Sequence, residues 1–328
     1  MNTHLPMRSA QQPRWSGTPA RQHVLVVGSV NVDLTMRTAR LPRAGETLLG
    51  ATFHMAPGGK GANQAAAAAR LGVPVVMVGR VGDDAFGAVT RDALAQAGVD
   101  VEHLLIDAST STGTAQIVVD AAGQNTIVVA SGANACLAPV DLDVAAWQGA
   151  GVLVLQLEVP LPTITTAVEM ARRQAIPILL NAAPAQPLPE DLTHNVDWLI
   201  VNEVEAEQLT GVTVRSPADA VTAARTLRTS GQRVAVTLGA GGAVLVQDAA
   251  CLHIPAAAVS AIDTTAAGDA FVGALAAGLL RGLPDDVALR HAVVAGSLAC
   301  TRIGAIPSLP TAGELARALA CHGRHGPE

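Results

Sequence analysis

His23–Ser29 (HVLVVGS) is a short, largely β-branched apolar run that ends in a glycine and a serine, and it predicts a buried first strand. Asn63–Leu71 (NQAAAAARL) predicts an alanine-rich helix that Gly72 ends, and Val75–Val81 predicts a second buried strand. The alternation continues with predicted helices at Asp84–Ala97, Thr163–Gln174, Glu203–Leu209 and Ser216–Thr229, and predicted strands at Val152–Leu157, Pro177–Asn181, Val196–Val201 and Val234–Leu238. Such alternation predicts an α/β fold, in which right-handed crossovers build a largely parallel sheet with helices on both faces.

Two stretches interrupt this alternation and predict a second, smaller sheet. Val32–Met55 lacks a helical pattern and alternates as strands do, and Thr114–Ser131 predicts two strands joined by a polar turn at Asp120–Asn125. We therefore expect a β-sheet inserted into the α/β body from about residues 31–57 and 112–132. Such a sheet can serve as a lid over a site or be mere decoration, and the pattern alone leaves both open.

The expected organisation is one α/β domain with short ends outside it. We assign residues 1–22 to a disordered leader, because they contain several prolines, glutamines and serines and lack the apolar segment of a secretory signal. Residues 23–320 form the predicted domain, and residues 321–328 form a tail. No apolar run in the sequence reaches the length of a transmembrane helix.

The composition argues against several classes of function. The formal net charge is −6 and no Lys/Arg-rich run occurs, whereas nucleic-acid-binding chains carry a basic patch. The four cysteines lie far apart without a C-x-x-C pair, which argues against a zinc or redox motif and favours a reduced, cytoplasmic chain. With three Phe, three Trp and no Tyr, a binding site built on aromatic stacking is disfavoured.

Asp263–Phe271 (DTTAAGDAF) carries the strongest chemical signal in the sequence. A predicted helix of small residues, Ala270–Leu280, follows it, so backbone N–H groups gather at a helix N-terminus. Unpaired N–H groups and the helix dipole attract anions there. Ala266, Ala267 and Gly268 are small enough for a phosphoryl group to approach this backbone closely.

Asp269 lies at the start of this predicted helix, beside the anion site. A carboxylate repels a phosphate, so its presence there suits a general base that takes a proton from an attacking hydroxyl. The alternative is a carboxylate that only caps its helix, which is the commoner role of Asp near a helix start. Thr264 or Thr265 is another candidate cap just upstream, and this weakens the alternative.

Three further segments carry weaker signals. Pro57–Asn63 (PGGKGAN) lacks Walker A spacing, but its glycines allow close approach of a ligand, and Lys60 and Asn63 offer donors to hydroxyl groups. Thr237–Gly242 (TLGAGG) follows a strand and suits a phosphate or a ribose, and the two carboxylates of Asn202–Glu205 (NEVE) suit Mg²⁺ held through water. Each segment also fits a plain structural role, as a glycine-rich turn, a strand exit or the acidic first turn of a helix.

Taken in order, nine segments resemble the ribokinase family of carbohydrate kinases from about Val24 to Pro310. They are GSVNVD (Gly28–Asp33), PGGKGANQ (Pro57–Gln64), VGDDAFG (Val81–Gly87), QLE (Gln156–Glu158), NAAPA (Asn181–Ala185), NEVEAEQLTG (Asn202–Gly211), TLG (Thr237–Gly239), DTTAAGD (Asp263–Asp269) and TRIGAIPS (Thr301–Ser308). The resemblance implies a ribokinase-like central sheet, mostly parallel and flanked by helices, with a small β lid over a sugar. It also implies ATP-dependent phosphorylation of a primary hydroxyl of a small sugar, with O5 of D-ribose the leading candidate.

The resemblance also implies a role for each matched residue. Asp269 is the expected base, and Ala266, Ala267 and Gly268 form the expected anion hole. The expected sugar-binding residues are Asn31, Asp33, Gly59, Lys60, Gly61, Ala62, Asn63, Glu158 and Asp269. The expected ATP-binding residues are Asn202, Thr237, Leu238, Gly239, Ala240, Gly241, Gly242 and Gly268.

The cofactors that the resemblance implies are Mg²⁺, which enters with ATP and is placed indirectly by Glu205, and a monovalent cation such as K⁺. The expected K⁺ ligands are the side chains of Asp263 and Ser308 and the backbone carbonyls of Thr265, Ala299, Arg302 and Gly304. A homodimer formed through the lid is the expected assembly. One departure concerns Val293, which stands where the family often has Asn or His near the adenine; His291 lies two residues earlier.

Two other readings of the sequence stay open. One is a kinase of the same fold for deoxyribose, a nucleoside or a ketohexose, although Phe53 is the only aromatic residue of the predicted lid and this argues against a nucleoside. The other, from a different class, is a non-catalytic regulator that binds a sugar or a nucleotide. The intact Asp269, anion-hole loop and cation-loop pattern argue against the regulator.

Overall fold

The computed structural model describes residues 22–322 of the chain. The predicted leader, residues 1–22, falls outside this range except for Gln22, whose backbone N–H donates to the carbonyl of Gly149 at 2.7 Å. The predicted tail, residues 321–328, falls mostly outside it. Within the described range, no helix is both long enough and apolar enough to cross a membrane.

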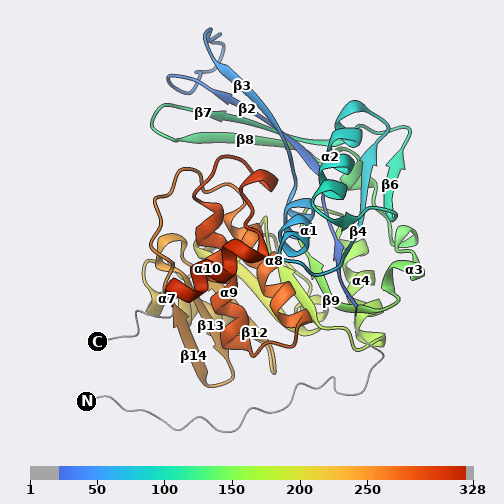
Figure 1. Cartoon of the computed structure of the whole chain (residues 1–328), viewed down its shortest axis with the longest axis vertical. Coiled ribbons are helices and arrows are strands. Elements are labelled where there is room, and N and C mark those ends of the chain that lie inside the picture. The colour runs from blue at the N-terminus through green and yellow to red at the C-terminus, as the bar shows by residue number, and fades with distance from the viewer. Residues whose placement is uncertain (1–21, 323–328) are drawn as a thin grey trace.

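A large sheet forms the centre of the molecule, with strand order β14-β13-β12-β11-β10-β9-β1-β4-β5 and with β6 paired to β4 (Figure 1). Its strands are β1 (His23–Val27), β4 (Val75–Gly82), β5 (Val99–Asp100), β6 (Leu104–Asp107), β9 (Ala150–Leu155), β10 (Ile178–Asn181), β11 (Trp198–Asn202), β12 (Arg233–Thr237), β13 (Ala243–Gln247) and β14 (Ala250–Ile254). Neighbouring strands pair in parallel from β12 to β5, which confirms the predicted α/β class. At one edge β13 and β14 run antiparallel, a meander that the sequence pattern did not predict.

Helices cover both faces of this sheet, because the strands are apolar on both sides. In β1, Val24 and Val26 face the core that contains α1 and α8, whereas Leu25 and Val27 face the core that contains α4 and α7. The helices are α1 (Lys60–Arg70), α2 (Ala85–Gln96), α3 (Val144–Trp147), α4 (Leu161–Arg173), α5 (Glu190–His194), α6 (Glu203–Thr210), α7 (Pro217–Leu227), α8 (Ala267–Leu280), α9 (Asp285–Ala299) and α10 (Ala312–His322). Short 3-10 turns lie at Gly132–Cys136, Pro139–Asp141, Gly239–Gly241 and Ile306–Ser308.

A second sheet of four strands, in the order β3-β2-β7-β8, projects from one end of the large sheet (Figure 1). Its strands are β2 (Asn31–Arg37), β3 (Thr52–Gly58), β7 (Gly113–Val119) and β8 (Asn125–Ala130). β2 follows β1 after three residues and β3 leads almost directly into α1, so the chain ties the inner end of the small sheet to the large one. The smaller inserted sheet is therefore present as predicted.

Candidate active site

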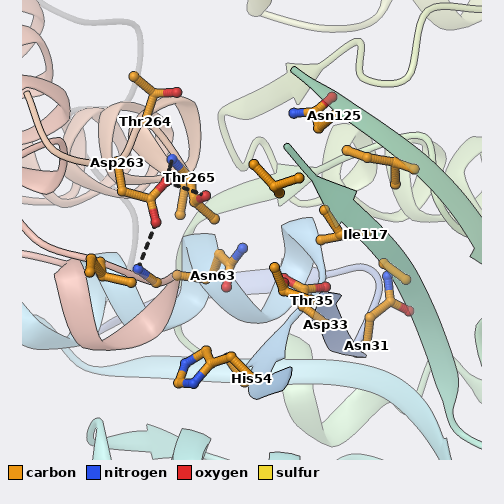
Figure 2. Close-up of a pocket in the computed structure, with 18 of the residues that line it drawn as sticks. Asn31, Asp33, Thr35, His54, Asn63, Ile117, Asn125, Asp263, Thr264 and Thr265 are labelled. Carbon is orange, nitrogen blue, oxygen red and sulfur yellow. Dashed lines mark hydrogen bonds between the residues drawn. The ribbon is translucent and has the colours of Figure 1, made fainter. Parts of the chain in front are cut away.

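A cavity of about 640 Å³ separates the small sheet from loops of the α/β body. Asn31, Asp33 and Thr35, alternate residues of β2, line it on one side, and Figure 2 shows them across the cavity from the loop Asp263–Thr265. Of the predicted sugar-binding residues, the cavity is also lined by Gly59, Lys60, Asn63, Glu158 and Asp269. Polar groups therefore crowd its inner end, where they suit a small ligand rich in hydroxyl groups.

A second cavity, of about 200 Å³, lies at the carboxyl ends of β11 and β12. It is lined by Asn202 and Thr237 and by the first turn of α8 with the residue before it, Ala266–Asp269. Ligands of α/β proteins bind at this edge of a parallel sheet. Lys60 and Asp269 line both cavities, so these two side chains lie at the junction between them.

The N-terminus of α8 has no side-chain cap. Ala266 is the N-cap residue, with a φ of 59° in the left-handed region. The expectation that Thr264 or Thr265 caps this helix is wrong, and Thr265 instead donates its hydroxyl to the Asp263 carboxylate at 2.6 Å. A Cβ placed on Gly268 would meet no atom within 4 Å. The first-turn N–H groups therefore have room for an anion close to the backbone.

The Asp269 carboxylate is held by side chains of α1 rather than by its own helix. Asn63 donates Nδ2 to Oδ2 and Gln64 donates Nε2 to Oδ1, both at 2.9 Å. α8 begins at Ala267, and the Asp269 carboxylate accepts no hydrogen bond from the N–H groups in the first turn of that helix. Asp269 therefore does not act as the cap of its helix. The carboxylate is buried, yet it borders both cavities.

Four carboxylates surround one lysine at this junction. Burial by itself would lower the pKa of Lys60, but Asp269, Glu158, Glu205 and Asp33 together raise it. Burial, with the nearby charges of Glu158 and Asp269, raises the pKa of Asp33 to about 6. Burial likewise raises the pKa of Asp269, against the opposing effects of Lys60 and the two amides that bind it. Perturbed carboxylates beside a fixed positive charge are typical of a catalytic site.

Two side chains at the inner end of the first cavity are fixed by hydrogen bonds. The Glu158 carboxylate accepts from the Ser29 hydroxyl at 2.5 Å and from the Lys60 backbone N–H at 3.2 Å. Asn31 accepts at Oδ1 from the amide of Asn134 at 2.7 Å. Both side chains are thus held in place before any ligand arrives, and a preorganised site binds with less loss of entropy.

Asp263 ties two loops together beside the start of α8. Its carboxylate accepts from the backbone N–H of Thr265 at 3.0 Å, in addition to the hydroxyl, and from the N–H of Gly304 at 3.0 Å, as the dashed lines in Figure 2 mark. Burial opposes ionisation, but these hydrogen bonds lower the pKa of Asp263. Ser308 is buried and donates its hydroxyl to the carbonyl of Ala305 at 2.8 Å. The structure thus brings the predicted Asp263 and Gly304 cation loops into contact.

The predicted nucleotide-binding residues divide into two groups. Asn202 and Thr237 line the second cavity, whereas Leu238–Gly242 lies outside both cavities. Asn202 also starts α6: its Oδ1 accepts from the Glu205 N–H at 2.8 Å, and the Glu205 carboxylate accepts from the Asn202 N–H at 2.9 Å. This capping box fixes Glu205 in the wall of the second cavity, where burial raises its pKa.

Val293 and His291 on α9 do not line the second cavity. Val293 is packed in the hydrophobic core between the sheet and the helices. His291 lies near Arg281 at the C-terminal end of α8, the end opposite the anion site, and burial together with Arg281 lowers its pKa. Neither side chain therefore contributes to the wall of the second cavity.

Three buried amide side chains next to the site, Gln64, Gln156 and Asn181, are not among the residues predicted from the sequence. All three lie in the motif segments quoted above, and Gln64 stands out as a polar residue at the head of an alanine run. Gly61 and Ala62, which were expected to bind sugar, are buried and line neither cavity. Thr35 follows Asn31 and Asp33 as the next residue on the cavity side of β2. The two-residue period of a strand therefore predicts that Thr35 lines the cavity.

Comparison with known proteins identifies the family to which the chain belongs. Residues 21–312 match the pfkB family carbohydrate kinase description, and the chain belongs to this family. It is 39% identical over 294 residues to a ribokinase of Haemophilus influenzae, covering 89% of this chain and 96% of that one. It is 38% identical over 292 residues to a deoxyribokinase of Salmonella typhimurium, covering 88% and 95%. The fold is similar to that of Arabidopsis thaliana ribokinase complexed with ribose and ATP, with a TM-score of 0.82 and 32% identity, covering 92% of this chain and 99% of that one.

Proposed function

We propose that this carbohydrate kinase transfers the γ-phosphoryl group of ATP to O5 of D-ribose, giving D-ribose 5-phosphate and ADP. The observation that carries the proposal is the position of Asp269 and Lys60 at the junction of the two cavities. One cavity offers acceptors for sugar hydroxyls, and the other offers a helix N-terminus for phosphates. A carboxylate at the junction lies where a hydroxyl proton has to leave as a phosphoryl group arrives.

The proposed reaction is an in-line transfer. The sugar binds with its secondary hydroxyls on Asn31, Asp33 and Glu158 and its primary hydroxyl beside Asp269, and ATP enters the second cavity afterwards. The bond from O5 to phosphorus forms as the bond from that phosphorus to the bridging oxygen of ADP breaks, and the O5 proton passes to Asp269. The amides of Ala266–Gly268 and the charge of Lys60 stabilise the developing negative charge, which is the largest contribution in such sites. Closure of the small sheet excludes water.

Two cations fit the residues around this path. Mg²⁺ bound with ATP would neutralise phosphate charge, and Glu205, which its capping box fixes, would hold the water shell of the ion. Asp263, the Ser308 hydroxyl and the carbonyls of Thr265, Ala299, Arg302 and Gly304 would supply only oxygen donors, which suit a hard monovalent cation such as K⁺. A cation held by these groups would stiffen the loop that presents the anion-hole amides.

The second candidate substrate is 2-deoxy-D-ribose, because the ribokinase and deoxyribokinase relatives are almost equally similar to this chain. The acceptors on Asn31, Asp33 and Glu158, of which hydrogen bonds fix Asn31 and Glu158, favour ribose, since a site built to bind a hydroxyl rejects an analogue that lacks it. The two sugars differ in one hydroxyl, so the ratio of their kcat/KM values decides between them.

A coupled assay of ADP release tests the proposed function. D-Ribose, 2-deoxy-D-ribose, D-fructose and adenosine are compared with and without K⁺, for the wild-type protein and for Asp269→Asn. We expect ribose to give the highest kcat/KM, and Asp269→Asn to lower kcat by roughly 10²-fold or more while calorimetry shows sugar binding retained. Absence of turnover with every sugar would favour a non-catalytic regulator, and near-normal kcat in Asp269→Asn would refute the assignment of the base.

We also propose that the outer face of the small sheet forms a homodimer interface. Residues that alternate with the cavity-lining ones are apolar and exposed: Met36, Phe53, Met55 and Val128, the last with an exposed fraction of 70%. β2 pairs with β3 so that Met36 lies opposite Phe53, which makes the patch continuous across the two strands. Apolar patches of this kind mark interaction surfaces.

The proposed location is the cytoplasm, where the cosubstrate ATP is available. Cys136, Cys251 and Cys300 are free thiols in the structure. Free thiols are the usual state of cysteine in a reducing compartment, so they support this location.

A further inference from the structure

A chain of buried amides leads from the end of β9 to Asp269. Gln156 donates Nε2 to Oε1 of Gln64 at 2.6 Å, and Gln64 donates Nε2 to Oδ1 of Asn181 at 3.1 Å and to Oδ1 of Asp269 at 2.9 Å. The exposed fractions of Gln64 and Gln156 are 1% and 0%, and neither residue lines the two cavities. Gln64 therefore contacts the carboxylate that faces the ligands without being placed to contact a ligand itself.

The hydrogen bonds fix which way each amide points. An ionised carboxylate can only accept, so Gln64 turns its NH₂ group to Asp269 and its carbonyl to Gln156, which meets it with its own NH₂ group. Gln156 Oε1 is then left without a partner in the described part of the chain, and it lies 1.9 Å from where a Cβ on Gly28 would stand. A buried acceptor without a partner is a loss of stability that native proteins tolerate mainly at functional sites.

Close packing of two helices holds Gln64 against the start of α8. A Cβ on Gly273, one turn after Asp269, would lie 2.7 Å from the backbone carbonyl oxygen of Gln64 and 2.5 Å from the Cβ of Ala67. α1 and α8 therefore touch backbone to backbone at this point. Because such a contact leaves no space for adjustment, the separation of Gln64 from Asp269 is set by the fold.

We propose that Gln64 and Gln156 are positioning residues for the phosphoryl transfer: Gln156 orients the Gln64 amide, and that amide fixes the direction of the Asp269 carboxylate. The inference rests on the proposed function, in which Asp269 is the general base. Asn63 holds the other carboxylate oxygen, but it also lines the sugar cavity and so combines two roles. Gln64 contacts the Asp269 carboxylate but lines neither cavity, so a substitution of Gln64 tests the orientation of Asp269 without removing a ligand contact.

The hydrogen bond from Gln64 affects both the orientation and the pKa of the Asp269 carboxylate. The charged groups that face Asp269 are Lys60 on α1, Asp33 on β2, Glu158 after β9 and Glu205 on α6. Burial raises the pKa of Asp269, and the charge of Lys60 and the hydrogen bonds from Asn63 and Gln64 oppose that rise. Removing the Gln64 donor raises the pKa further, so the base stays protonated up to a higher pH. The acid limb of the kcat profile then moves to higher pH.

The test uses Gln64→Leu and Gln156→Leu, which keep the approximate size of the side chain and remove the amide. Gln232→Leu is the matched control, because Gln232 has an exposed fraction of 1%, and its amide donates to the carbonyls of Thr193 and Val196 near the opposite end of the parallel strands. For each protein, kcat and the sugar KM are measured from pH 5 to pH 9, and a thermal melt reports folding.

We expect Gln64→Leu to lower kcat by about 10- to 100-fold at pH 7, as misplacement of a catalytic group does, with the acid limb moved to higher pH and the sugar KM little changed. Gln156→Leu should act in the same direction with a smaller effect, and Gln232→Leu should alter the melt alone. A folded Gln64→Leu with wild-type kcat, or with a lower kcat and an unmoved acid limb, overturns the proposal. If Gln64→Leu does not fold, Gln156→Leu decides by the same two readouts. Lack of sugar-dependent turnover in the wild type would instead refute the proposed function.

Discussion

Asp33→Asn is expected to stabilise the ligand-free protein at neutral pH while it weakens sugar binding. Burial, together with Glu158 and Asp269, raises the pKa of Asp33 from 3.8 to about 6. The folded state therefore binds this proton more tightly than the unfolded chain does. The stabilisation that the proton contributes is complete below pH 3.8, and it is lost as the pH rises through about 6.

The size of the effect follows from the shift. A difference of about 2 pH units corresponds to about 3 kcal/mol, at about 1.4 kcal/mol for each unit. This is the free energy by which ionisation of Asp33 destabilises the fold above pH 7, and an amide avoids it because it carries no charge. The free energy of unfolding of Asp33→Asn should therefore exceed that of the wild type by up to about 3 kcal/mol at pH 8, and by close to zero at pH 4.

Urea unfolding at pH 4, 6 and 8 measures this difference. Asp92→Asn, on the exposed face of α2, controls for loss of a surface carboxylate. The sugar KM of Asp33→Asn is measured alongside and should rise, because a charged acceptor for hydroxyl groups is lost. A stability difference that does not vary with pH, or a variant less stable than the wild type at pH 8, would refute the reasoning.

Four other substitutions test the remaining features of the site and the small sheet. Gly268→Ala should fold normally, because its Cβ meets no atom within 4 Å, yet it should lower kcat/KM for ATP. Gly61→Ala should lose stability, since its Cβ would lie 2.6 Å from the Ser29 nitrogen and overpacking costs about 1–3 kcal/mol. A thermal melt and ATP kinetics of both variants separate the two effects, and the reverse pattern would contradict them. Asp263→Asn should abolish the response to K⁺ in a titration of KCl against choline chloride, and equal activation of variant and wild type would exclude the cation site there. Phe53→Lys should change a dimer to a monomer in light scattering with unaltered sugar kinetics, and a wild-type monomer or an unchanged mass would remove the proposed interface.

The order of buried strands and helices could be predicted from the sequence because it depends on the local pattern of apolar residues. The apolar run of β1 and the alanine run of α1 each match one structural period, and the parallel sheet follows from their alternation. The antiparallel edge could not be predicted in the same way. β13 and β14 are five residues each, and their direction depends on the short turn between them and on which neighbour they meet, which periodicity does not encode.

In the candidate site, too, the features set by local sequence could be predicted, and those set by long-range packing could not. Asp269 and the small residues before it form one continuous motif, so their proximity to a helix N-terminus was predictable. The missing side-chain cap was not, because it depends on the left-handed backbone of Ala266 rather than on the residue types nearby. The contact between Gln64 and Asp269 joins residues 205 positions apart, and only the packing of α1 on α8 brings them together.

The central claim is that the backbone amides at the start of α8 hold the migrating phosphoryl group while Asp269 accepts the proton of its acceptor. A crystal structure of the protein with D-ribose, Mg²⁺, ADP and aluminium fluoride tests it most directly. We predict fluorides about 2.7–3.2 Å from the first-turn amides and O5 of the sugar within hydrogen-bond distance of the Asp269 carboxylate. Aluminium fluoride bound away from that turn, or O5 directed at another side chain, would contradict the claim.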